Sequence, residues 1–316
     1  MERRTTGGPP PSFHEGEIAV QHRSGVRAEA RHLARMLEPP ELTGGVVGYL
    51  AEQAFLVLTA RDNGGVLWTS PLVGPKGFLE VTAPSHLRIA ATPSPRDPLH
   101  GLPPGQEIGM VTTEFARRRR FRLNGHLTAA GRSGLSVQVA QAYSNCPQYI
   151  QRRALQVTDT APRDSAADPD VGRMSNRLSE GDIEQVRAAD TFFLGTTHPS
   201  RGSDASHRGG PPGFVRLEDD QTLWWPDYPG NNMFNSLGNL AVDSAAALLF
   251  VDFTTGHTLH LTGRAVLHAT APGISGDDGH TGRRVRFHLD VATVGAPLPL
   301  RVVRSTASSR NPPLTA

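Results

Sequence analysis

The chain has 316 residues, which is enough for two domains of ordinary size, each with a real core. Its 32 basic and 30 acidic side chains leave a net charge of only +2, too weak a bias to indicate a nucleic-acid partner. Cys146 is the single cysteine, so an intramolecular disulfide is excluded and a reducing, cytoplasmic location is expected. We expect no signal peptide and no membrane span, because the first residues lack an apolar segment and no run of about 18 apolar residues exists.

The first half of the chain predicts helices followed by short strands. Residues 1–23 are expected to be a poorly ordered lead-in, and a helix is expected from Val26 to Leu37, where apolar residues recur at helical spacing. A second helical stretch is expected near residues 49–53. Strands are then predicted at 55–60, 66–70, 78–81, 87–90, 108–113 and 121–127, with a tight turn at 62–65. Residues 133–154 are interpreted as a helix, a turn and a short helix that close this unit.

The second half repeats this order after a linker. Residues 156–176 are rich in Asp, Ser, Ala and Pro, which places the expected domain boundary near residue 165 and divides the chain into 1–165 and 166–316. Ser179 is a predicted N-cap of the next helix. Strands are predicted at 191–196, 248–253 and 258–265, with a turn at 218–221. Short strands between Gly and Pro turns are typical of a small antiparallel barrel, so the predicted class is mainly β with flanking helices (α+β).

A sequence repeat supports two similar units. Residues 204–216 have a fainter copy 136 residues earlier, which begins at Ser70. The copies pair Ser70 with Ser206, Gly74 with Gly210, Pro75 with Pro211, Gly77 with Gly213, Phe78 with Phe214, Phe115 with Phe253, and 121–125 with 259–263. Such self-similarity indicates that one structural unit was used twice. Two copies in one chain can pack as a built-in dimer, and the seam between them is a natural ligand site.

Polar residues cluster in the second unit only. Residues 224–239 carry Asn231, Asn232, Asn235, Ser236 and Asn239 between strand and helix signals. Amide side chains and backbone N–H groups near a helix start suit a phosphate or the edge of a heterocycle. The aligned residues of the first unit, 95–101, lack this cluster, which predicts one well-equipped site rather than two. The alternative is that these Asn residues only cap turns.

The strand after the repeat start suggests an anion clamp. On a strand, Ser206 and Arg208 share one face, so a hydroxyl and a guanidinium would point the same way, with His207 between them. A solvated strand face is the alternative. Residues 117–120, four arginines in a row, are interpreted as a solvated hairpin turn, because no aromatic residues alternate with them. No metal-binding motif is present, and we expect no metal site.

Several segments of the second unit resemble the pyridoxamine 5′-phosphate oxidase-like family, the FMN-binding split barrels. The resemblance is carried by residues 206–215, 223–232, 238–240, 248–253 and 261–265. The first unit resembles the family more faintly, and residues 143–150 are similar to the segment that closes the barrel in its two-unit branch. The resemblance implies two tandem Greek-key split barrels that pack as a pseudo-dimer, with a further homodimer left open. The basic strand of true pyridoxamine phosphate oxidases is replaced by 206–211, and their C-terminal arginines are not recognisable in 301–305, which puts pyridoxamine phosphate as substrate in doubt.

The resemblance also implies a cofactor and a reaction. It assigns cofactor contacts to Ser206, His207, Arg208, Asn231, Asn232, Asn235, Asn239 and Arg264. The expected cofactor is FMN, and the expected activity is hydride transfer through the flavin N5 to or from an unidentified small substrate or a nicotinamide donor. No catalytic side chain is predicted. The alternatives are a non-catalytic flavin-binding module, or a related barrel that holds haem or a deazaflavin.

Overall fold

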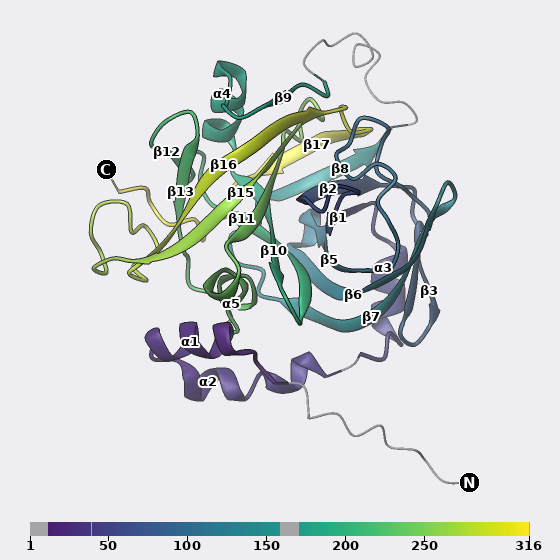
Figure 1. The fold of residues 1–316 in the computed structure, drawn as a ribbon, viewed down its shortest axis with the longest axis horizontal. Helices are drawn as coiled ribbons and strands as arrows, with labels where there is room; N and C mark the ends of the chain where they lie inside the picture. Colours follow the sequence, from purple (N-terminus) through teal and green to yellow (C-terminus); the bar gives the residue numbers. More distant parts are fainter. Residues whose placement is uncertain (1–11, 39, 159–170, 316) are drawn as a thin grey trace.

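A computed structural model describes residues 12–38, 40–158 and 171–315. In the first half, the elements are α1 (Glu15–Arg23), α2 (Arg27–Arg31), the 3-10 helix η1 (Ala34–Leu37), α3 (Gly45–Ala51), β1 (Phe55–Arg61), β2 (Leu67–Val73), β3 (Leu79–Ala83), β4 (His86–Ile89), β5 (Gln106–Glu114), the 3-10 helix η2 (Phe115–Arg117), β6 (Arg119–Gly131), β7 (Gly134–Asn145) and β8 (Arg152–Val157). Strands β1 to β7 form one large antiparallel sheet, which curls around an apolar core (Figure 1).

The second half contains a matching set. Its elements are β9 (Met174–Ser175), α4 (Glu180–Ala188), β10 (Thr191–His198), β11 (Gly202–Gly209), β12 (Arg216–Leu217), β13 (Thr222–Pro226), α5 (Asn235–Val242), β14 (Ala245–Val251), β15 (Thr258–Ala269), β16 (Arg283–Gly295) and β17 (Leu300–Thr306). Ser179 caps α4 as predicted, since its side chain accepts from the backbone N–H of Asp182. The strands surround a second, separate apolar core.

The two sheets have the same topology. The first has the order β2-β1-β5-β6-β7-β4-β3, and the second has β11-β10-β14-β15-β16-β13-β12. Adding nine to each strand number of the first order gives the second order, so β1 corresponds to β10, β2 to β11, and so on along the chain. This confirms the prediction of a mainly β chain built from two tandem barrels.

Strand register confirms two of the matches that the sequence repeat predicted, Ser70 with Ser206 and Leu123 with Leu261. Ser70 lies opposite Leu58 in β1, and Ser206 lies opposite Leu194 in β10. On the next strand, Met110 lies opposite Leu123, and its counterpart Leu248 lies opposite Leu261. Ser70 and Ser206 therefore occupy equivalent places, as do Arg122 and His260, which each precede the matched leucine.

The barrels pack against each other as a pseudo-dimer. β11 lies against β5 and β14 lies against β2, the same relation in both directions. Aromatic side chains from both units share a third apolar core at this seam, among them Phe55, Phe115, Phe193 and Phe253. β8 and β17 pair to form a two-stranded ribbon that joins the halves at one end (Figure 1).

The lead-in forms a helix that belongs, in space, to the second barrel. α1 packs on α5 and closes the underside of the second unit (Figure 1). The contact is close, because a Cβ added to Gly16 would lie 2.1 Å from the backbone oxygen of Gly238. The expectation of a poorly ordered lead-in is therefore wrong for residues 15–23, where His14 and Glu17 form a capping box. Residues 1–11 lie outside the described part of the chain.

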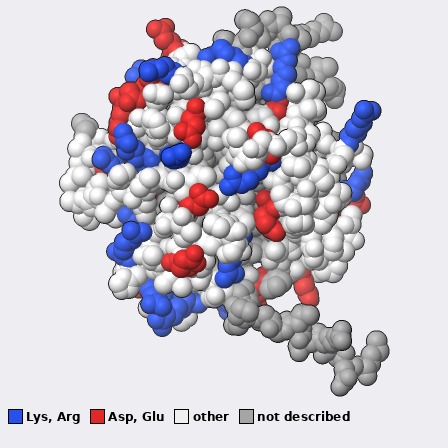
Figure 2. Space-filling model, in the orientation of Figure 1, with Lys and Arg blue, Asp and Glu red and all other residues white. Residues whose placement is uncertain are grey.

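Of two other expectations, one differs from the structure and one falls outside the described residues. The expectation of helices over residues 133–154 is wrong, because β7 occupies 134–145 and β8 begins at Arg152. β7 alternates Leu135, Val137 and Val139 into the core with other residues between them, the period of a strand. The expected boundary near residue 165 falls within 159–170, outside the described residues. Among the described residues, no helix is long and apolar enough to cross a membrane. Basic and acidic side chains are interspersed on the face shown in Figure 2.

Candidate functional site

A cavity at the seam collects most of the predicted residues. It has an empty volume of about 590 Å³, part of it open to solvent. The second unit supplies β11, the loop after β13 and the start of α5, whereas the first unit supplies one end of β6 and the end of β7. Of the predicted residues, Ser206, His207, Arg208, Asn231, Asn232 and Asn235 line it. The structure therefore brings together six of the eight positions in one place.

The β11 residues are held by the sheet and by ion pairs. The hydroxyl of Ser206 donates to the carbonyl of Leu194 on β10 at 3.3 Å, and it also accepts from Ser236 at 3.0 Å. The guanidinium of Arg208 lies 3.5 Å from Asp227 in the loop after β13. Both side chains line the cavity, as their shared strand face predicts.

His207 also lines the cavity but sits deeper in the seam. Its ring packs edge-on against Phe115 of the first unit and Phe193 of the second. Burial, with Arg120, Arg153 and Arg208 nearby, lowers the pKa of His207 well below its ordinary value, so the ring is neutral at neutral pH.

The remaining predicted residues divide into two cases. Asn239 lies one turn further along α5, where its amide donates to Thr196 at 3.0 Å, and it lines a small polar cavity between α1 and β11 rather than the main one. Asn235 lines both cavities. Arg264 is exposed on β15, opposite Ala245 and His288, and lines no described cavity. The structure thus separates Arg264 from the other predicted residues.

The first unit adds two arginines that the sequence reasoning missed. Arg120 and Arg122 are two apart on β6, so they share a face, while Phe121 and Leu123 face the first core. Arg120 and Arg122 both line the cavity of the second unit. The interpretation of residues 117–120 as a solvated turn is therefore wrong for Arg120. The available signal was the alternation of arginine with apolar residues after the turn.

Arg120 has no acidic partner among the described residues. Its Nη1 donates to the backbone oxygen of His207 at 3.1 Å and lies 3.3 Å from the ring nitrogen Nδ1. Burial, with Arg122 and Arg208 close by, lowers the pKa of Arg120 to about 9, which still leaves it charged at neutral pH. Its Nε atom is buried without a hydrogen-bond partner, as is that of Arg208. Desolvated cations with unused donors at a cavity wall fit an anionic ligand.

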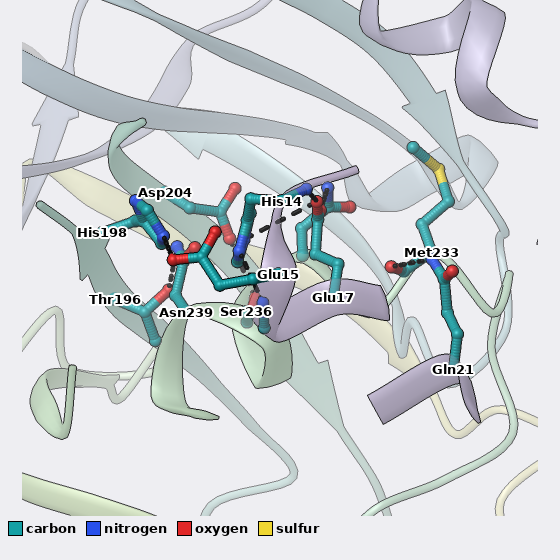
Figure 3. Close-up of polar contacts among 12 residues, drawn as sticks. His14, Glu15, Glu17, Gln21, Thr196, His198, Asp204, Met233, Ser236 and Asn239 are labelled. Atoms are coloured by element: carbon teal, nitrogen blue, oxygen red, sulfur yellow. Dashed lines mark hydrogen bonds and ion pairs between the residues drawn. The ribbon is translucent and has the colours of Figure 1, made fainter. Parts of the chain in front are cut away.

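Arg122, by contrast, is anchored. Its Nη1 lies 3.0 Å from Asp204 on β11, and both side chains are buried. Asp204 also accepts from the hydroxyl of Ser236 at 2.8 Å (Figure 3). This carboxylate therefore links β6 of the first unit to α5 of the second. The carboxylate of Asp204 is the main reason that the pKa of Arg122 is raised despite its burial.

A second cavity adjoins the first and is lined by aromatic residues. Its empty volume is about 470 Å³, and it shares Arg120, His207 and Arg208 with the first cavity. Tyr149 and Tyr228 both line it, and their rings are in contact, with centroids 4.9 Å apart. Other residues of this cavity are Cys146, Gln148, Gly209, Phe214, Trp225, Pro226, Pro229 and Gly230. A cationic cavity beside an aromatic one suits a ligand that joins an anion to a planar ring system.

The equivalent place in the first unit is filled. There the hydroxyl of Ser70, the counterpart of Ser206, donates to Asp97 at 2.6 Å. His260, the counterpart of Arg122, hydrogen-bonds the carbonyl of Thr69 and lies 3.9 Å from Asp97. All these side chains are buried. A carboxylate and a neutral ring at this place do not favour an anion, which agrees with the predicted single site.

One histidine pair lies away from the cationic and aromatic cavities. Donor atoms of His14, Glu15 and His198 lie within 4.8 Å of one another. However, Nδ1 of each ring accepts a backbone N–H, from Gly16 and Ser200 respectively, so Nε2 carries the proton in the neutral ring. Nε2 of His198 contacts Glu15 at 3.1 Å. This contact between Glu15 and His198 therefore links α1 to β10 (Figure 3).

The comparisons with known proteins agree with the predicted resemblance. The profile of the pyridoxamine 5′-phosphate oxidase family matches residues 182–275, which include every predicted site residue. No curated protein matches the chain.

Similar solved structures each match part of this chain. HupZ from Group A Streptococcus is 11% identical, with a TM-score of 0.30, and covers 36% of this chain and 92% of its own. A putative pyridoxamine 5′-phosphate oxidase from Lactobacillus delbrueckii is 13% identical, with a TM-score of 0.31, and covers 37% and 94%. A structure described as an F420 reductase is 12% identical, with a TM-score of 0.26, and covers 41% and 98%.

Proposed function

Because residues 182–275 match the pyridoxamine 5′-phosphate oxidase family, we propose that this chain is a flavin-dependent oxidoreductase that binds one FMN at the seam of its two barrels. The observation that carries this proposal is Arg120, a desolvated cation that faces the cavity without a carboxylate partner among the described residues. A phosphate group would supply the missing negative charge.

The residues present fit FMN at both ends of the ligand. Arg120 and Arg208 have unused Nε donors and line the same cavity, so these two would hold the phosphate. Ser206, whose hydroxyl donates to Leu194, would line the site beside them. Asn231 and Asn235 offer amides for the hydroxyls of the ribityl chain. Tyr149 and Tyr228 line the adjoining cavity, and a flat ring system would pack against them.

When bound, FMN supplies the redox chemistry by carrying a hydride at N5. The side chains of this chain would bind and orient the cofactor and exclude water from the seam. No described side chain has to donate or accept a proton for that role, which agrees with the lack of a predicted catalytic residue. A small substrate or a nicotinamide donor as partner, and the cytoplasm as location, remain predictions.

The test is direct. The protein is purified, its absorbance is recorded, and FMN is titrated into any cofactor-free fraction. We expect a flavin spectrum and a stoichiometry of one FMN per chain. Absence of both a flavin spectrum and FMN uptake would reject the proposal. Mass spectrometry of the co-purifying molecule separates FMN from a deazaflavin or haem.

A non-catalytic flavin-binding module is the second candidate, and one observation favours it. Phe234 lines the cationic cavity and Trp225 the aromatic one, so bulky rings stand beside the proposed ligand. Trp224 lies elsewhere, between Arg216 and Arg284. Photoreduction of the bound flavin followed by exposure to air and candidate substrates distinguishes the two, because a covered ring would reoxidise slowly with every acceptor tried.

A further inference from the structure

The helix that precedes the first barrel reaches the ligand site of the second barrel. α1 lies against α5, with Gly16 and Gly238 in backbone contact. Gln21 on α1 donates to the carbonyl of Met233 at 3.2 Å, which fixes the loop that enters α5 (Figure 3). α1 is therefore placed to act on residues at the start of α5, although Gln21 and Met233 are 212 positions apart in sequence.

Glu17 is the α1 residue that contacts the site. Its Oε2 accepts from the backbone N–H of His14 at 2.9 Å, which caps the helix. Its Oε1 accepts from the side-chain amide of Asn235 at 2.6 Å, which is not a capping contact. Glu17 is buried, and a buried carboxylate is costly unless it is hydrogen-bonded. Helix capping accounts for the contact with His14 but not for the contact with Asn235.

Asn235 connects this contact to the ligand cavity. It is the first residue of α5 and lines both the cationic cavity and the small cavity beside Glu17. When Nδ2 donates to Glu17, the rotation of the amide is fixed, and with it the direction of Oδ1. Within the described residues, Oδ1 accepts no hydrogen bond. An acceptor oxygen suits a ligand hydroxyl and does not suit a phosphate oxygen.

We propose that Glu17 is a positioning residue for the ligand site: it holds Asn235 in the rotamer that accepts from a hydroxyl of the ligand's sugar-alcohol chain. The inference rests on the proposed function, because FMN supplies both the hydroxyls and the probe. It also gives the lead-in helix a role in binding, in addition to its role in packing.

The experiment measures FMN and riboflavin affinities by fluorescence titration. Riboflavin keeps the hydroxyl chain and lacks the phosphate, so Glu17→Ala should weaken both ligands by the same factor, about 5- to 30-fold, the worth of one such hydrogen bond. Glu17→Gln keeps an acceptor for Asn235 and should stay within about threefold of the wild type. Glu15→Ala removes the contact of α1 with His198 on β10, away from the start of α5, and should leave both affinities unchanged.

A double-mutant cycle completes the test. On an Asn235→Ala background, Glu17→Ala should have little further effect, because the two residues act through one contact. An equal loss on both backgrounds, or full affinity in Glu17→Ala, overturns the proposal. If the wild type binds no flavin, the proposed function fails first. Glu17 is then tested by the NMR signals of the Asn235 side-chain amide, which Glu17→Ala must shift and Glu15→Ala must not.

Discussion

Arg120 of the first barrel donates to the backbone oxygen of His207 in the second at 3.1 Å, so one unit supplies part of the wall of the other unit's cavity. The predicted site residues all belong to the second unit, but the cavity that most of them line is formed by both units. A cation held by a carbonyl and a neutral imidazole is incompletely neutralised, and the most direct completion is an anionic ligand.

Replacing Arg120 should remove the preference for a phosphorylated flavin. In Arg120→Met we expect FMN affinity to fall about 10- to 100-fold, the range for one charge-assisted hydrogen bond, while riboflavin affinity changes little. Isothermal titration with both ligands measures this. Arg117→Met is the matched control, since Arg117 is exposed and pairs with Glu114. Equal losses for FMN and riboflavin would place the phosphate elsewhere.

Removing the charge of Asp204 should destabilise the seam. Asp204→Asn leaves the buried Arg122 without its counter-charge, and we expect a loss of about 3–5 kcal/mol in the free energy of unfolding. Urea denaturation measures it. Asp220→Asn breaks the exposed pair with Arg177 and should cost no more than about 1 kcal/mol. Similar losses in both variants would contradict the buried pair as a main link between the barrels.

The contact between α1 and α5 should tolerate no side chain at Gly16. Its added Cβ would lie 2.1 Å from the carbonyl oxygen of Gly238, so one helix must move. We expect Gly16→Ala to cost about 1–3 kcal/mol, as for other overpacked contacts, and to weaken flavin binding through the displaced α5. Thermal unfolding and FMN titration give the two readouts. Gly45→Ala, which meets no atom within 4 Å, should change neither.

The burial of Glu17 should make stability depend on pH. Burial is the main cause that raises the pKa of Glu17 from 4.5 to about 7, so the folded chain binds this proton more tightly than the unfolded chain does. The stabilisation that the folded chain gains from protonated Glu17 is fully present below pH 4.5 and is lost as pH rises through 7. Relative to Glu17→Gln, the wild type should lose roughly 3 kcal/mol between about pH 4.5 and about pH 8. Urea denaturation of both proteins at several pH values checks this, and a constant difference between them would refute it.

Much of the second unit could be predicted from sequence because its signals are local. Ser206 and Arg208 share a strand face by their spacing, and the asparagines follow one another at the start of a helix. The role of Arg120 could not be predicted from its neighbours in the sequence. Its direction is set by strand alternation, but whether that face meets solvent or another barrel depends on how the barrels pack.

Two further predictions were wrong for different reasons. The short, polar lead-in has too weak an apolar pattern to predict α1, which is stabilised by its contact with α5. In residues 134–145, small and polar residues separate the valines, and the strand period was overlooked because alanine and glutamine also favour helices. Arg264 was assigned by resemblance alone, and the structure places it on an exposed face.

The non-equivalence of Arg122 and His260 has a consequence for how such a molecule can change. In an assembly of identical subunits, a substitution on one side of the twofold axis appears on the other side as well. Here the two halves are one polypeptide, so each can change without the other. The second unit carries the asparagines of the cavity and the first unit contributes arginines to it. A symmetric homodimer would have to repeat this arrangement on both sides of its axis.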